Sequence, residues 1–242
     1  MRNTYKSEKI VDLIVKAYDQ KKGVFKNRIN AEDFVPKNAS NKNKSLFLFY
    51  IIQLDYAVKS KYLYKRGVKL FNENPNYFTP IYILNLSKTK LYNLLINRIK
   101  PRYINEAVKR WQINSNILIE KYKSNPLNIF NTSKDALIVL KSIRNFRGFG
   151  PKIGNFVLRT CINVFNFELK NIDKVFQPVD RHNVRLTYEW GFLSNKKMSI
   201  KNINNVKNIW QKACKEADVS WLKFDRALWI FGSEKGNLES II

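Results

Sequence analysis

The sequence predicts an all-α protein, and three observations support this prediction. Apolar residues recur at helical spacing along most of the chain, and clusters containing Asn and Pro separate the helical stretches. Strand-like alternation of polar and apolar residues is not sustained. The 242 residues, 45% of them hydrophobic, suffice for a substantial core, and no repeat or low-complexity linker divides them. We therefore expect one unit over residues 1–242, made of two helical lobes that are interleaved in sequence.

Three helical regions follow from the spacing of apolar residues in the first half of the chain. The first spans residues 10–17. The second is a stripe over residues 46–68 that includes Ala57, and the turn cluster at 72–76 closes it. Pro101 opens the third helix. One face of that helix carries Ala107, Trp111, Asn114 and Leu118.

A fourth helical region leads into the most informative stretch of the chain. Asn-Pro at residues 125–126 breaks the third helix, and residues 132–135 are typical of a capping box before the apolar run 136–140. This helix is expected to end near Phe146. A new helix begins near Pro151, because proline is tolerated at the first helical position, where its missing N–H is not needed.

Two glycines occupy the turn between these helices. Gly148 and Gly150 permit positive φ and leave the backbone bare. Backbone N–H groups at the start of a helix form a cradle for phosphate when no side chain covers them. The alternative is an ordinary turn between two helices, in which glycines are common.

The charge of the chain favours a polyanionic partner. Lys and Arg number 44 against 19 Asp and Glu, which gives a formal net charge of +25. So large an excess is typical of proteins that bind DNA or RNA. Ribosome association, attachment to a membrane surface and the composition of an AT-rich genome are the alternatives.

Cysteine and histidine are too few for several classes of site. Cys161 and Cys214 are the two cysteines and His182 is the one histidine, so a disulfide framework, a zinc site, an iron–sulfur cluster and a catalytic triad are not expected. The longest apolar run, residues 46–54, is too short to span a bilayer. We expect no signal peptide, no side-chain metal site and no cofactor, and a cytoplasmic protein.

The residues around the two glycines bear a specific likeness. Residues 146–152, Phe-Arg-Gly-Phe-Gly-Pro-Lys, resemble the hairpin of the helix-hairpin-helix DNA glycosylase superfamily, which includes endonuclease III and the 8-oxoguanine glycosylases. Residues 177–185, Gln-Pro-Val-Asp-Arg-His-Asn-Val-Arg, follow in the right order and resemble the proline-containing loop and aspartate of that signature. Weaker likeness at residues 50–53 and 102–107 extends the resemblance to about three-quarters of the chain.

The resemblance implies a two-lobed glycosylase fold. Its helix-hairpin-helix motif would cover about residues 135–165 at the mouth of the cleft between the lobes, and a catalytic aspartate loop would cover about 176–186. The cluster-binding cysteines of endonuclease III are missing, which implies a cluster-free member. The stretch between Lys152 and Asp180 is longer than in typical members, and we expect the extra residues 166–174 to form a surface loop.

The resemblance also implies the chemistry. Lys152 matches the lysine of bifunctional members, which attacks C1′ of the damaged nucleotide and forms a Schiff base with the opened sugar. Lysine is a nucleophile only after its ammonium loses a proton, and placement at a helix N-terminus beside other cations favours that loss. The alternative role of Lys152 is a phosphate contact.

Asp180 matches the second catalytic group of the family. Its carboxylate would stabilise positive charge on the deoxyribose and help to deprotonate Lys152. The alternative is an N-cap, because Asp180 stands directly before a predicted helix. Both roles are compatible, since a capping aspartate is held rigidly.

Further roles follow from the same resemblance. The residues predicted to contact DNA are Gly148, Phe149, Gly150, Arg147 and Gln53, the last filling the space of a flipped base. A plain buried glutamine is the alternative for Gln53. A monovalent ion is expected on the backbone carbonyls of Arg144, Phe146 and Phe149.

The predicted base-recognition pair lies near the C-terminus. Asp225 and Trp229 stand four residues apart, so they share one helix face. They resemble the polar and aromatic residues with which 8-oxoguanine glycosylases embrace the base. The alternative is a core tryptophan and a surface aspartate. Oxidised guanine is therefore the leading substrate, ahead of uracil and thymine glycol.

The sequence thus predicts a monomeric bifunctional DNA glycosylase and lyase of base-excision repair. Its partner would be double-stranded DNA containing a damaged base, in a prokaryotic nucleoid. Three alternatives stay open: a monofunctional glycosylase, a non-catalytic DNA-binding protein that kept the hairpin, and an RNA-binding module favoured by charge alone.

Overall fold

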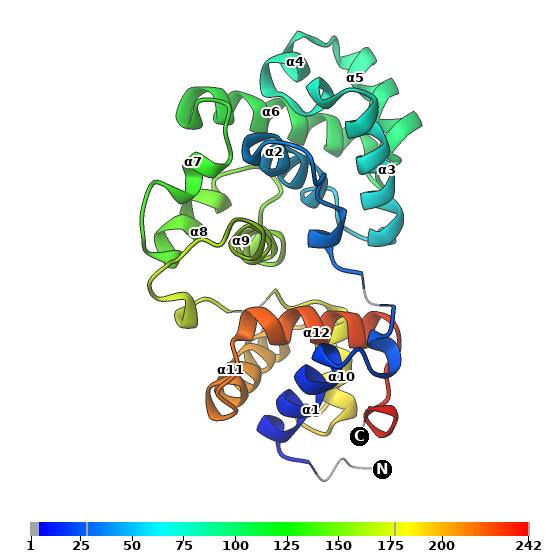
Figure 1. The fold of residues 1–242 in the computed structure, drawn as a ribbon, viewed down its shortest axis with the longest axis vertical. Helices are drawn as coiled ribbons and strands as arrows, with labels where there is room; N and C mark the ends of the chain where they lie inside the picture. Colours follow the sequence, from blue (N-terminus) through cyan, green and yellow to red (C-terminus); the bar gives the residue numbers. More distant parts are fainter. Residues whose placement is uncertain (1–4, 28, 177, 242) are drawn as a thin grey trace. The chain divides into compact units, whose positions relative to one another are not determined.

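The computed structural model describes residues 5–27, 29–176 and 178–241 (Figure 1). These residues form α-helices, short 3-10 helices and one π-helical turn (Leu95–Ile99) without a β-strand, and one isolated bridge joins Asp135 to Lys170. The all-α prediction is confirmed. The chain divides into two compact units: unit 1 comprises Met1–Asn30 and Asp173–Ile242, and unit 2 comprises Ala31–Ile172.

Unit 1 combines the two ends of the chain. Its α-helices are α1 (Ser7–Asp19), α10 (Arg181–Glu189), α11 (Ile200–Glu216) and α12 (Trp221–Ser233). Trp210 of α11 is fully buried at the centre, where it meets Trp190 edge to face and Phe224 at a tilt. The Trp210 indole N–H donates to the Thr187 hydroxyl at 2.9 Å, so the polar edge of this large ring is satisfied.

Unit 2 is built around one buried helix. Its α-helices are α2 (Asn41–Ile52), α3 (Ser60–Glu73), α4 (Pro80–Asn85), α5 (Lys88–Leu94), α6 (Ile104–Tyr122), α7 (Leu127–Phe130), α8 (Ala136–Arg144) and α9 (Pro151–Phe165). Every residue of α2 from Ser45 to Ile52 is buried, because α3 and α9 pack against it. Tyr50 of α2 stacks at a tilt on Trp111 of α6, and its hydroxyl bonds to the Ser115 hydroxyl at 2.6 Å.

The third predicted helix has the expected buried face. Ala107, Trp111, Asn114 and Leu118 are all buried within α6, so the predicted face is confirmed. The prediction that Pro101 opens this helix is wrong, because α6 begins at Ile104 after a bend. The second predicted stripe, over residues 46–68, is wrong as a single element. The helix ends at Ile52, and Ala57 lies exposed in the turn before α3 with φ of +54°.

The capping box predicted at residues 132–135 is also wrong. Asp135 itself is the N-cap of α8, and its carboxylate accepts the Leu137 N–H at 2.8 Å. Ser133 accepts the Asp135 N–H in a preceding turn. Asp135 is therefore the N-cap itself, and it is not the third helical residue that a capping box starting at Thr132 requires.

The extra residues between Lys152 and Asp180 are packed, although several are exposed. Lys170 exchanges backbone hydrogen bonds with Lys134 and Ala136 beside the start of α8. Phe167 stacks on Phe130, with ring centroids 4.5 Å apart. Unit 2 ends at Ile172, so this segment carries the chain back toward unit 1.

Within the described part of the chain, no helix has the length and apolar character needed to cross a membrane.

Candidate nucleic-acid interface and catalytic residues

The hairpin turn has the predicted helix ends. The turn between α8 and α9, residues 145–150, is called the hairpin turn below. Pro151 occupies the first turn of α9, as predicted. Gly148 has φ of +85°, which favours glycine, whereas Gly150 has φ of −68° and does not need it. A Cβ at Gly150 would meet nothing within 4 Å, so the backbone there is bare, as expected. At Gly148 the prediction of a bare backbone is wrong, because a Cβ there would lie 2.7 Å from Arg110 Nε.

The start of α9 lacks a cap of its own. Gly150 is the N-cap residue and offers no side-chain acceptor, so the first N–H groups of α9 have no capping partner. These groups and the helix dipole favour an external anion.

Lys152 stands at the second position of α9, half-buried. Its ammonium makes no hydrogen bond or ion pair to another described residue. Pro151 fixes the backbone just before it. Lys152 therefore combines a positioned backbone with an unengaged amine.

Arg147 projects from the hairpin turn into an exposed ion pair. Its guanidinium donates to both carboxylate oxygens of Glu106, at 2.9 and 3.0 Å. Arg110 donates to the same carboxylate at 3.2 Å. The hydrogen bonds from Arg147, followed by those from Arg110, lower the pKa of Glu106. The side chains of Arg147 and Glu106 are 44% and 32% exposed, so the pair is a weak one that another anion could replace.

Phe149 is not available for a side-chain contact with DNA. It is 1% exposed, and its ring stacks on Phe49 of α2 at 5.1 Å and meets Phe146 edge to face. The ring therefore anchors the turn in the core, and a contact between Phe149 and DNA stays a prediction. The backbone carbonyl of Phe146, one of three predicted ion ligands, accepts the Phe149 N–H at 3.2 Å.

Gln53 also has a structural position. It is fully buried at the end of α2, where its amide donates to the Phe49 carbonyl at 3.2 Å and accepts from Asn114 at 3.0 Å. Gln53 is thus a buried glutamine in this structure, as the alternative states, and its contact with DNA stays a prediction.

Asp180 caps α10 in unit 1. Its Oδ1 accepts the N–H groups of His182 at 2.7 Å and Asn183 at 3.1 Å, and Asn183 Oδ1 accepts the Asp180 N–H in return. The capping alternative is therefore confirmed. Its Oδ2 accepts no hydrogen bond from another described residue, so the carboxylate keeps acceptor capacity beyond the cap. Gln177, the first residue of this motif, lies outside the described residues.

The predicted base-recognition pair lies on α12 of unit 1. Asp225 is 2% exposed and Trp229 is half-buried. The alternative of a surface aspartate is therefore wrong. Gly232, one turn further along, packs so closely on α10 that a Cβ there would lie 2.8 Å from His182 Cβ. The last turn of α12 thus adjoins the helix start that Asp180 caps.

The two thiols are poor nucleophiles. Burial raises the pKa of Cys161 far above its usual range, and burial together with the nearby Asp225 raises the pKa of Cys214 to about 12. Both thiols therefore stay protonated near neutral pH. Among the described residues, no group of three or more His, Cys, Asp and Glu is placed to hold a metal ion.

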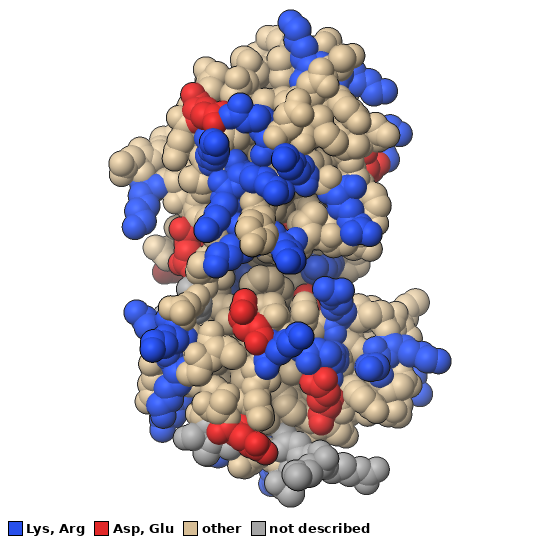
Figure 2. Space-filling model, turned by 90° about the vertical axis from the view of Figure 1, so that its right-hand side faces the viewer, with Lys and Arg blue, Asp and Glu red and all other residues tan. Residues whose placement is uncertain are grey.

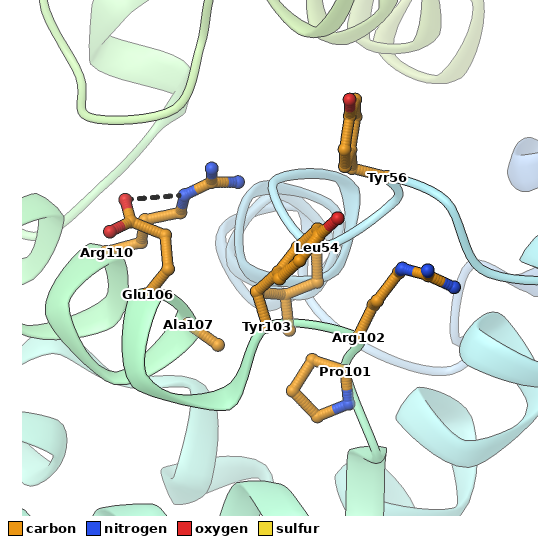
Figure 3. Close-up of a pocket in the computed structure, with 8 residues that line it drawn as sticks. All are labelled: Leu54, Tyr56, Pro101, Arg102, Tyr103, Glu106, Ala107 and Arg110. Carbon is orange, nitrogen blue, oxygen red and sulfur yellow. Dashed lines mark hydrogen bonds and ion pairs between the residues drawn. The ribbon is translucent and has the colours of Figure 1, made fainter.

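An aromatic and cationic patch beside α6 is absent from the sequence-based prediction. A pocket of about 20 Å³ opens between the end of α2 and the start of α6, where Arg110 also lies (Figure 3). Tyr56 and Tyr103, each 53% exposed, flank it with ring centroids 6.0 Å apart, and Arg102 lies 5.8 Å from the Tyr103 ring centroid. The pocket is too small for a nucleobase, but the exposed rings offer stacking surfaces. The neighbouring Arg102 and Tyr103 in the sequence are the feature that could have indicated this patch.

The charge distribution and a second hollow complete the description of unit 2. Figure 2 shows one face of the molecule, on which Lys and Arg side chains gather over the unit 2 part. A hollow of about 710 Å³ lies against α3 and the segment before α2, and no predicted site residue lines it.

The structure thus places Arg147, Gly148 and Gly150 on the hairpin turn of unit 2, with Lys152 just after it on α9. It places Asp180, Asp225 and Trp229 in unit 1. The chain matches no protein-family model, and no curated protein matches it.

Proposed function

We propose that the protein is a DNA base-excision glycosylase with lyase activity, in which Lys152 is the nucleophile. The observation that carries the proposal is the start of α9, where an uncapped helix N-terminus and an unengaged lysine occur together. The uncapped N–H groups would hold a DNA phosphate, and Lys152 would then be near the sugar attached to it. The net charge of +25 supports a polyanionic substrate.

The proposed reaction begins at the sugar. The neutral Lys152 amine forms a bond to C1′ as the bond between C1′ and the base breaks, and the base leaves with that electron pair and takes up a proton. The sugar ring opens to give an imine between Lys152 and C1′. Loss of a proton from C2′ then lets the bond to the 3′ phosphate oxygen break, and water releases the lysine.

Asp180 is proposed to assist the first step. Its carboxylate would offset the positive charge that develops on the deoxyribose. The capping role of Asp180 supports this proposal, because two backbone N–H groups hold Oδ1 in one place. Oδ2 would then be available to the substrate. Preorganised charge of this kind is the main source of electrostatic catalysis.

Oxidised guanine is the proposed lesion, and duplex DNA the partner. The buried Asp225 and half-buried Trp229 on one face of α12 would supply a polar and an aromatic contact to the extruded base. The exposed Tyr56 and Tyr103 rings and Arg102 would stack on unpaired bases.

A non-catalytic DNA-binding protein is the second candidate. The observation in its favour is the capping box at Asp180, which explains that residue without any chemistry. Such a protein would bind duplex DNA with strong salt dependence and form no covalent intermediate.

Borohydride trapping tests the proposal. Duplexes carrying 8-oxoguanine, uracil, thymine glycol or an abasic site are incubated with the wild type and with Lys152→Gln. We expect a trapped adduct with the wild type alone, strongest on 8-oxoguanine, and DNA affinity largely retained in the variant. Tight binding without an adduct on any duplex would contradict the lyase and favour a monofunctional enzyme or the non-catalytic protein.

A further inference from the structure

A single side chain of α6 grips the backbone of the hairpin turn. Asn114 is fully buried, and its Oδ1 accepts the Arg147 N–H at 2.8 Å. Its Nδ2 donates to the Arg147 carbonyl at 3.0 Å. One amide group thus satisfies both backbone polar groups of the residue that precedes Gly148.

The orientation of this amide is fixed by its partners. The Arg147 N–H requires an acceptor and the Arg147 carbonyl requires a donor, so only one placement of the Asn114 oxygen and nitrogen serves both. The second hydrogen on Nδ2 is directed to Gln53 Oε1 at 3.0 Å. Gln53 in turn donates to the Phe49 carbonyl of α2 at 3.2 Å. A chain of hydrogen bonds therefore runs from α2 through Gln53 and Asn114 to the turn.

Arg110 also packs against the hairpin turn. Its guanidinium donates to the Gln53 carbonyl at 2.7 Å. A Cβ on Gly148 would lie only 2.7 Å from Arg110 Nε, so Arg110 occupies the space beside this glycine. The turn is thus held by a buried amide and by an arginine that packs against its positive-φ glycine.

We propose that Asn114 is a positioning residue, which sets the hairpin turn in the conformation that presents its glycine backbone to a DNA phosphate. That Asn114 sets the turn does not depend on the proposed function. That the turn presents its backbone to a DNA phosphate rests on the proposed DNA-binding function. The hydrogen bonds to the turn explain why this buried position of α6 carries a polar residue. A buried amide costs free energy unless it is hydrogen-bonded, and the three hydrogen bonds of Asn114 go to the turn and to Gln53.

Two variants separate positioning from ordinary core packing. Asn114→Leu keeps the approximate shape and removes all three bonds, and Asn114→Asp keeps the acceptor for the Arg147 N–H but removes the two donated bonds. Ser115→Ala is the matched control. Ser115 is the next residue of α6, equally buried, and its hydroxyl bonds to Tyr50 and to the Trp111 carbonyl rather than to the turn.

Hydrogen exchange of backbone amides gives a readout that does not depend on DNA. We expect the Arg147 amide to exchange at least about tenfold faster in Asn114→Leu than in the wild type, because the hydrogen bond that protects it is gone. In Asn114→Asp and Ser115→Ala the Arg147 amide should keep its protection. Unchanged exchange at Arg147 in Asn114→Leu would overturn the proposal. If that variant does not fold, faster exchange at residues 148–150 in Asn114→Asp takes its place, and unchanged exchange there would overturn it.

Binding of a labelled duplex with a reduced abasic site then tests the functional step. We expect Asn114→Leu to bind the duplex about tenfold more weakly than the wild type, because one or two phosphate contacts of the turn are lost. The duplex affinity of Ser115→Ala should equal that of the wild type. Equal losses in both variants would overturn the positioning role in DNA binding. If the wild type itself does not bind the duplex while exchange responds as expected, the grip on the turn stands and the proposed function fails.

Discussion

The two helices that begin at predicted catalytic residues start in opposite ways. At the start of α10, Asp180 accepts two backbone N–H groups, and Asn183 returns a bond to its backbone. At the start of α9, Gly150 supplies no side chain, and no described residue forms a hydrogen bond or ion pair with the Lys152 ammonium. One helix N-terminus is capped by a carboxylate of the chain, and the other has no side-chain cap.

This difference indicates a division of labour. A capped N-terminus holds its carboxylate in place, which suits a group that must meet developing charge in a fixed geometry. An uncapped N-terminus is less stable by itself and gains most from binding a phosphate. Under the proposed function, the nucleophile would lie where a substrate phosphate completes the start of α9. The carboxylate lies at the start of α10, which is already capped.

The largest expected effect comes from removing the charge of Asp180, the residue that caps α10. Asp180→Asn should slow base release by about 10²- to 10⁴-fold, the range of general acid–base catalysis, because the amide carries no negative charge. Thermal stability should change little, since Asn caps a helix about as well as Asp. Single-turnover kinetics and thermal unfolding measure the two effects.

Asp180→Ala separates the two roles further, since it removes both. It should lose about 1 kcal/mol of stability in addition to the rate. If Asp180→Asn keeps the wild-type rate while Asp180→Ala loses stability, capping is the whole role of the residue.

The second effect tests the turn that leads into the uncapped helix. Gly148→Ala should destabilise the protein by more than about 1 kcal/mol, because φ is +85° and Arg110 occupies the space of the new Cβ. Duplex affinity should fall alike for every sequence, as measured by fluorescence anisotropy. Gly191→Ala in unit 1 is the matched control, with φ of +82° and no neighbour within 4 Å. If both variants keep wild-type affinity, the turn does not contact DNA.

The sequence was sufficient for the local structure of the turn. The positive φ at Gly148 and the helix start at Pro151 follow from residue types whose backbone preferences are strong. The N-cap at Asp180 follows in the same way. The failures lie where packing overrides pattern: residues 46–68 keep helical spacing across the break at Ala57.

The roles of Gln53 and Phe149 needed the structure. A family resemblance places both at the DNA, but contacts distant in sequence bury them, with Asn114 61 residues from Gln53. The ion pair between Arg147 and Glu106 spans 41 residues and has no local signal either. Long-range pairs of this kind are not encoded in any short window, which is why the partners of the turn were missed.

The third prediction converts the open helix start into a capped one. Gly150→Asp should stabilise the protein by a few tenths of a kcal/mol, because φ is −68°, the new Cβ meets nothing, and the carboxylate caps α9. Duplex affinity should nevertheless fall by about tenfold, since the carboxylate takes the place of the phosphate. Gly150→Ser gives a neutral cap, and Asn93→Asp, at an exposed position of α5, gives the same change of net charge elsewhere. An equal loss in Asn93→Asp would mean that general charge, and not the helix start, sets the affinity.

The smallest effect sharpens the comparison by changing the neighbour of the open helix start. Glu106→Gln keeps the shape of the side chain but frees Arg147 from its bidentate pair, so Arg147 gains a phosphate as its best partner. We expect tighter duplex binding and a plot of log K against log salt concentration that is steeper by about one, the value of one added phosphate contact. Glu189→Gln on α10 makes the same change of net charge by removing the carboxylate that Arg185 binds at i, i+4, and it should leave the slope unchanged. An unchanged slope in Glu106→Gln would mean that Arg147 supports the turn without contacting DNA, and the phosphate contacts of the uncapped helix would then come from its backbone and Lys152.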